Sequence, residues 1–69
     1  MSAFKPPRAE LRHVRAAANE AFFYSSIAAS NDRVGQHEIS ASQWRQAAAA
    51  SKRAFNLSAK VAARSGAQP

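Results

Sequence analysis

The chain has 69 residues, which is room for one small domain, and 18 of them are alanine. It carries ten lysines and arginines against four aspartates and glutamates, a formal net charge of +6, and it has no cysteine. These numbers exclude a disulfide framework, a cysteine zinc site and the larger nucleotide-binding folds, and they favour an acidic partner.

Residues 1–6 are predicted to form an extended lead-in, and Pro6 and Pro7 suit the first turn of a helix. A helix is predicted over about residues 7–30, because small and apolar residues recur there at steps of three and four. Its predicted packing face consists of Leu11, Val14, Ala18, Ala21, Phe22, Ser25 and Ala29. A second apolar pair, Phe23 and Ile27, points elsewhere, so this helix should need more than one neighbour.

Residues 31–39 are predicted to form a loop, since they contain Asn, Asp and Gly and lose the helical periodicity. Ser40 followed by Gln43 has the spacing of a capping box, in which each side chain satisfies a backbone amide of the first turn. Ile39 and Trp44 have the spacing of the accompanying hydrophobic staple. Together these signals predict that a second helix begins near Ala41.

The second helix is predicted over about residues 41–65, with Gly66 at its C-terminal cap and residues 66–69 as a frayed tail. Alanine, the best helix former, dominates its middle. Its predicted main packing face consists of Trp44, Ala47, Ala48, Ser51, Phe55, Ser58 and Ala62, and Ala50, Ala54, Leu57 and Val61 extend this face sideways.

The fold class that follows is all-α: two long antiparallel helices that form a helical hairpin in a single domain, residues 1–69. A chain this short, with so much alanine, buries little apolar area by itself, so oligomerisation is the natural source of further stability. We therefore expect a homodimer, most simply a four-helix arrangement of two hairpins. The predicted dimer contacts are Phe22, Phe23, Ile27, Phe55, Leu57 and Val61.

The search for reactive chemistry finds no catalytic constellation. His13 and His37 have no metal-like spacing, and the nine serines have no partner set of the kind that activates a nucleophile. We expect no enzyme, no cofactor and no metal site. No apolar run is long enough to span a membrane, and the absence of cysteine fits a cytoplasmic location.

The strongest functional feature is a basic stripe on the second helix, since no acidic residue follows Glu38. It is interpreted as a partner-binding surface, although a solvated face that keeps an alanine-rich helix soluble is the simpler alternative. One of the successive aromatic residues 22–24 should also reach the surface, where an aromatic side chain beside arginines is typical of a binding hot spot. The predicted partner contacts are Arg45, Lys52, Arg53, Asn56, Lys60, Arg64 and Tyr24.

The length, the Met-Ser start, the alanine and arginine usage and the two-helix layout from Arg8 to Ser65 resemble the small early proteins of transposable phages of Pseudomonas. Within that group the resemblance is to the quorum-sensing anti-activator type. It implies a helical homodimer in the cytoplasm of the host cell. That dimer would bind a LuxR-type quorum-sensing regulator and block its DNA binding, and would also bind the type IV pilus assembly ATPase. It assigns no role to any single residue.

The sequence thus predicts a small inhibitory module that binds a host protein. The first alternative is a nucleic-acid-binding protein, in which the basic stripe would contact phosphates and binding would fall steeply with salt. The second alternative is a structural or assembly component.

Overall fold

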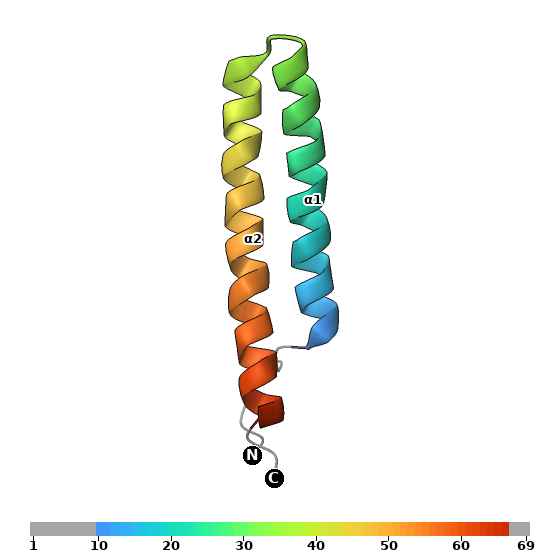
Figure 1. Cartoon of the computed structure of the whole chain (residues 1–69), viewed down its shortest axis with the longest axis vertical. Coiled ribbons are helices and arrows are strands. Elements are labelled where there is room, and N and C mark those ends of the chain that lie inside the picture. Colours follow the sequence, from blue (N-terminus) through green and yellow to red (C-terminus); the bar gives the residue numbers. More distant parts are fainter. Residues whose placement is uncertain (1–9, 67–69) are drawn as a thin grey trace, which may run out of the picture.

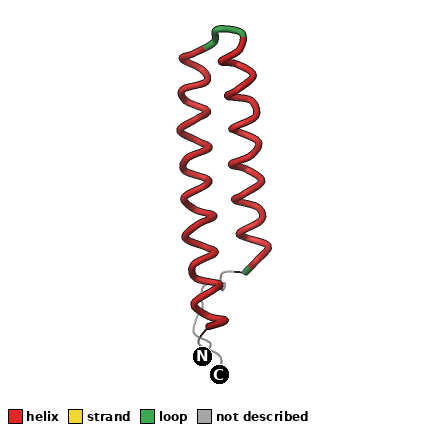
Figure 2. The backbone as a smooth tube through the Cα atoms, viewed as in Figure 1, coloured by secondary structure: helices red, strands yellow, loops and turns green. Residues whose placement is uncertain are grey.

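The structure, a computed structural model, describes residues 10–66 as two antiparallel helices that lie side by side, with the end of the second, longer helix extending beyond the first (Figure 1). Helix α1 spans Leu11–Arg33 and helix α2 spans His37–Gly66. The short turn that joins them lies at one end, called here the turn end, and the other is called the open end (Figure 2). The predicted all-α hairpin is confirmed. The lead-in over residues 1–6, the predicted helix start at residue 7 and the tail beyond residue 66 lie outside the described residues.

The predicted loop over residues 31–39 is wrong in its length, because only three residues, 34–36, separate the two helices. The amide of Gln36 donates to the carbonyl of Asn31 at 2.8 Å, and the amide of Gly35 donates to that of Asp32 at 3.1 Å. This pair of bonds is a Schellman motif, which places Gly35 at C′ with φ +82°. Because glycine adopts that left-handed conformation without a Cβ clash, the motif lets α1 continue to Arg33.

The predicted capping box at Ser40 and Gln43 is also wrong. Helix α2 begins one turn earlier, at His37, and the amide of Ser40 already donates to the carbonyl of Gln36 at 3.0 Å. The two side chains instead cross to α1, where Ser40 contacts Asp32 and Gln43 contacts Asn31. Polar side chains near a helix start can hydrogen-bond to groups of the neighbouring helix as well as to backbone amides of their own helix. Sequence spacing does not distinguish the two cases.

The two helices meet along a seam of residues that recur at alternating steps of three and four, with alanine or serine at every fully buried position. All of its members are buried or half-buried, and Ala28 and Ala50 are 0% exposed. A repeat of seven residues keeps one stripe of each helix against the other, as in a coiled coil. The seam consists of Val14, Ala17, Ala21, Tyr24, Ala28 and Asn31 of α1 and of Ser40, Gln43, Ala47, Ala50, Ala54, Leu57, Val61 and Arg64 of α2.

The predicted packing faces are therefore displaced to one side of the true seam. Phe22, Phe55 and Trp44 were assigned to the contact between the helices, but all three are exposed. The packing faces were predicted from the positions of the largest apolar side chains. The helices instead pack through alanine, because small side chains let the two axes approach closely. What appeared to be a sideways extension at Ala50, Ala54, Leu57 and Val61 is the centre of the contact on α2.

The seam makes a direct prediction for stability. Ala50→Leu places a larger side chain where there is no space and should lower the free energy of unfolding by about 1–3 kcal/mol. Ala49→Leu makes the same change at the neighbouring exposed position and should alter it by about 0.5 kcal/mol or less. Urea unfolding followed by circular dichroism measures both, and equal losses for the two variants would contradict the seam.

Candidate interaction surfaces

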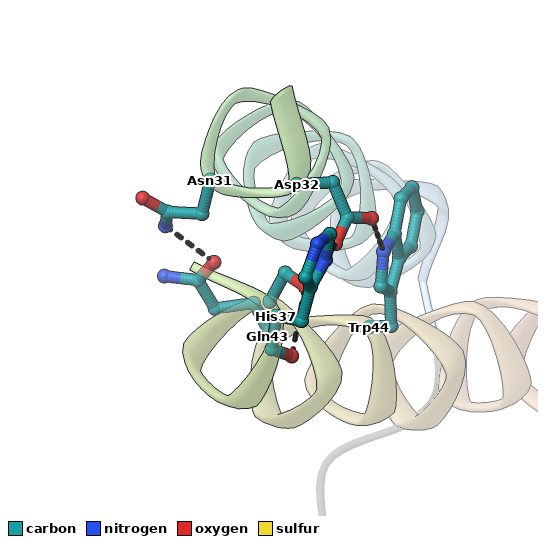
Figure 3. Close-up of polar contacts among 6 residues, drawn as sticks. Asn31, Asp32, His37, Gln43 and Trp44 are labelled. Atoms are coloured by element: carbon teal, nitrogen blue, oxygen red, sulfur yellow. Dashed lines mark hydrogen bonds and ion pairs between the residues drawn. The ribbon is translucent and has the colours of Figure 1, made fainter. Parts of the chain in front are cut away.

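A polar cluster centred on Asp32 ties the turn end of α1 to the first turns of α2 (Figure 3). The carboxylate of Asp32 accepts hydrogen bonds from the Ser40 hydroxyl and from Trp44 Nε1, the latter at 2.9 Å. His37 Nδ1 lies 3.1 Å from the same carboxylate. The Ser40 hydroxyl has one hydrogen and also lies 3.0 Å from the His37 carbonyl, but the ionised carboxylate is the stronger acceptor. Ser40 is only 2% exposed, whereas the side chain of Asp32 is 40% exposed, so the cluster joins a buried hydroxyl to a carboxylate that still reaches water.

These contacts alter the acidity of Asp32. The hydrogen bond from Ser40 contributes most, those from Trp44 and His37 add to it, and together they lower the pKa of Asp32 from 3.8 to about 2. The folded chain therefore favours the charged carboxylate more than the unfolded chain does. The stability that results is present above pH 3.8 and is lost as the pH falls through about 2.

The remaining polar contacts of the hairpin are structural. Asn31 Nδ2 donates to Gln43 Oε1 at 2.8 Å next to the Asp32 cluster. At the start of α1, the Glu10 amide donates to His13 Nδ1 at 3.1 Å. No group of three or more His, Cys, Asp or Glu side chains among residues 10–66 could hold a metal ion. The site that this structure offers is therefore a set of exterior surfaces.

The first surface lies on the side of the hairpin where Trp44 meets Asp32. Leu11, Ala18, Ser25 and Asp32 follow one another at intervals of one heptad, so they share this side of α1. Phe22 lies on the same side, because it stands four residues after Ala18 and three before Ser25. Phe55 shares it on α2, four residues after Ser51, which is one heptad from Trp44. We call Leu11, Phe22, Trp44 and Phe55 the aromatic face. Phe22 is 74% exposed and Phe55 is 72% exposed.

The opposite side is marked by the ion pair between Arg53 and Glu20, at 2.9 Å. Ile27 lies one heptad from Glu20, and Phe23 lies between the two on the same side of α1. Ile39 and Lys60 share it on α2, each a whole number of heptads from Arg53. We call Phe23, Ile27, Ile39, Arg53 and Lys60 the mixed face, because exposed apolar side chains there adjoin cations.

The predicted partner residues do not form one stripe. Arg45 and Lys52 lie on the outer ridge of α2, and the others that remain exposed, Arg53, Asn56 and Lys60, lie toward the mixed face. Arg64 is half-buried at the open end of the seam. Tyr24 is half-buried as well, with its ring edge-on to Phe23 at a centroid distance of 5.5 Å. Tyr24 is therefore less exposed than a surface aromatic would be, and Phe22 and Phe23 are the more exposed rings of this segment.

The predicted dimer residues divide in the same way. Phe22 and Phe55 belong to the aromatic face, whereas Phe23 and the half-buried Ile27 belong to the mixed face. Leu57 and Val61 are half-buried in the seam between the chain's own two helices. Sequence reasoning missed the role of Asp32 altogether. The one signal was the presence of an acid at the end of α1, two residues before a turn that returns the chain against it.

Comparison of the chain with known protein families, with characterised proteins and with solved structures finds no match. Across residues 10–66, neither helix combines the length and the apolar character that crossing a membrane requires.

The Asp32 cluster predicts acid sensitivity. Asp32→Asn should lower the melting temperature at neutral pH and should flatten the loss of stability between pH 3.8 and about 2. Circular dichroism measures the melting temperature, and the fluorescence of Trp44, the single tryptophan, reports directly on the contact. Glu38→Gln is the matched control, because it removes a charge from the first turn of α2 but leaves the cluster intact. An acid loss that is the same in all three proteins would place its origin elsewhere.

Proposed function

We propose that the chain is a small inhibitory protein-binding module, a homodimer in the host cytoplasm that captures a host protein by direct contact. One observation supports this most: large apolar side chains are exposed on two opposite sides of the hairpin. Within the part of the chain that the structure describes, the buried core is only Ala17, Ala21, Ala28, Ala47, Ala50 and Ser40. Exposed apolar surface of this kind is typical of protein interaction sites. Two opposite faces allow one contact with a second copy and another with a partner.

The homodimer is supported by the thinness of the core. Each buried alanine contributes far less apolar area than the leucine or isoleucine usual at such a seam. A hairpin of two helices also leaves most of each helix surface uncovered. A second copy supplies the missing burial.

Analytical ultracentrifugation tests this part of the proposal. At micromolar concentration the expected result is a discrete species of two chains, which dissociates and loses helicity together on dilution. A stable, fully helical single chain at that concentration would remove the dimer from the proposal. A polydisperse large particle would favour the assembly alternative.

The partner is inferred to present an acidic surface with an apolar centre. The mixed face combines Phe23 and Ile39 with Arg53 and Lys60, and the chain as a whole carries +6. Aromatic and basic side chains together are the usual composition of binding hot spots. Complementary charge also speeds association with an acidic partner.

The resemblance to phage early proteins supplies the specific candidates, a LuxR-type quorum-sensing regulator and the type IV pilus assembly ATPase. The nucleic-acid alternative is favoured by a separate observation, the concentration of cations in the open half of the hairpin, namely Arg12, Arg15, Lys52, Arg53, Lys60 and Arg64. One gel-shift experiment separates these two possibilities.

In that experiment a purified LuxR-type regulator is bound to its operator DNA, and this protein is titrated in. The proposal expects the regulator to be released from the DNA. Lys52→Glu with Lys60→Glu should weaken that release by about tenfold or more. Arg53 is left unchanged, since reversing its charge would set two carboxylates at the Glu20 pair.

The matched control compares Lys60→Glu alone with Arg33→Glu, which changes the net charge equally on the outer ridge of α1 and leaves the ion pair of Arg12 with Glu10 intact. If this protein shifts random duplex DNA by itself, with a steep fall in affinity as salt rises, the nucleic-acid alternative is correct. If it neither releases the regulator nor binds DNA, the LuxR-type partner is wrong.

A further inference from the structure

We propose that a second copy of this chain covers the aromatic face in a head-to-tail orientation, with Phe22 and Phe55 of both copies at the centre of the contact. The turn end of each hairpin lies against the open end of the other. This inference rests on the homodimer of the proposed function, and it names the face and the orientation. The mixed face stays outside, free for the partner.

Charge selects this face. A chain of net charge +6 repels its own copy, so self-association is favoured on a face whose own charges balance. Between its large side chains the aromatic face presents Ala18, Ser25, Ala48, Ser51 and Ser58. Its charged side chains are Arg15 and Asp32, and the latter is already engaged by Ser40 and Trp44. The mixed face, by contrast, contains Glu20, Arg53 and Lys60.

The exposed area is of the size that a dimer needs. From their exposed fractions, Leu11, Phe22, Trp44 and Phe55 together leave about 450 Å² of mostly apolar surface in water. That is within the range of the largest patch on a typical monomer, about 300–600 Å². The alanines and serines between them extend the surface toward the roughly 800 Å² per partner of a standard interface.

The positions of the rings fit a two-fold axis across the middle of the hairpin. The ion pair of Glu20 with Arg53 sets those residues level with one another, and Phe22 and Phe55 each lie two residues away from this level. Phe22 is also the central residue of the 23-residue helix α1. A two-fold axis at this height, perpendicular to the helices, stacks α1 on α1 and α2 on α2 of the second copy and gathers all four rings.

Side-chain size is complementary at the two ends. Trp44 lies eleven residues from Phe55 toward the turn end, and Leu11 lies eleven residues from Phe22 toward the open end. The axis therefore sets Trp44 opposite the small residues near Ala62 of the second copy, and Leu11 opposite those near Ala29. Large side chains meet small ones, as close packing requires.

The distribution of charge along the hairpin selects the head-to-tail orientation. In the turn half, Arg33 and Arg45 are balanced by Asp32 and Glu38. Among the described residues of the open half, the six cations named above are accompanied by two carboxylates, Glu10 and Glu20. A parallel dimer would set two strongly positive halves side by side, whereas the head-to-tail dimer sets each positive half against a neutral one.

Two substitutions of neighbouring exposed rings test the choice of face. Phe22→Ser should raise the dimer dissociation constant by about thirtyfold or more, since it removes a central aromatic anchor. Phe23→Ser changes the neighbouring exposed ring on the mixed face and should leave the dissociation constant within a factor of about three. Sedimentation across a concentration series measures both. If Phe23→Ser dissociates the dimer and Phe22→Ser does not, the face is wrong while the dimer stands.

Cysteine cross-linking tests the orientation in a chain that has no cysteine of its own. Ala48→Cys mixed with Ser58→Cys should give a cross-linked heterodimer with a short bis-maleimide, because the axis brings these positions to nearly the same height. Ala41→Cys alone should give none, since head-to-tail packing holds its two copies at opposite ends, tens of ångströms apart at about 1.5 Å per residue. Self-linked Ala41→Cys without the mixed product would overturn the head-to-tail orientation.

These cysteines replace exposed small residues, so they decide the question even if Phe22→Ser fails to fold. A wild-type chain that sediments as a single chain would instead refute the homodimer of the proposed function. A dimer with neither cross-link pattern would refute the aromatic face as the contact.

Discussion

The close approach of two helices through alanine is the constraint on which the rest of this structure depends. Ala28 and Ala50 are fully buried and leave no space for larger side chains at their positions, and every large aromatic residue of the described chain except the half-buried Tyr24 is exposed. In most helical proteins the seam takes the large apolar residues and the exterior is polar. Here the seam brings the backbones together and the exterior holds the apolar area. The exposed apolar surfaces that can bind other molecules follow directly from this placement of small residues inside and large ones outside.

A seam of small residues also raises the importance of the polar contacts at the turn end. Asp32 gathers three partners from α2, and Asn31 engages Gln43 beside it. These bonds fix the register, that is, which residues of α2 lie level with which residues of α1. The buried alanines specify this register only weakly, because they are all alike. The Glu20–Arg53 pair repeats that register near mid-length. The positions of Phe22 and Phe55 on a common face depend on it.

The number of helices, their antiparallel arrangement and the middle of each helix could be predicted from the sequence, because periodicity and the absence of interior glycine and proline are local signals. The ends of the helices and the identity of the seam could not. Gly35 was interpreted as part of a loop, although one glycine at C′ is enough to reverse the chain. Ser40 and Gln43 had the spacing of a capping box, yet their partners are on α1, and nothing in the local sequence reveals a partner across a turn.

The same limit applied to the candidate site. Helical spacing showed that Phe22 and Phe23 point to different sides, but it could not decide which side faces the second helix, since alanine occurs on all of them. The basic residues of α2 were interpreted as one stripe because the spacing of Arg45, Lys52 and Lys60 was taken to place them on one exposed side of the helix. The seam fixes the rotation of α2, and that rotation separates Arg45 and Lys52 from Arg53 and Lys60. If α2 were rotated about its axis by one residue position, different side chains would lie on each exterior surface.

The two sides of the hairpin thus have different roles in the proposed dimer: the aromatic face contributes to folding, and the mixed face contributes to binding. If the aromatic face needs a second copy to be covered, then the folded state is present only above a threshold concentration of chains, by mass action. The mixed face, with its cations beside exposed apolar side chains, is then displayed twice on the dimer, and a partner that offers two acidic sites gains from both at once. Since the cations are concentrated toward the open end of each chain, a head-to-tail dimer also separates its two most positive regions, which lowers the repulsion that +6 per chain would otherwise impose on assembly.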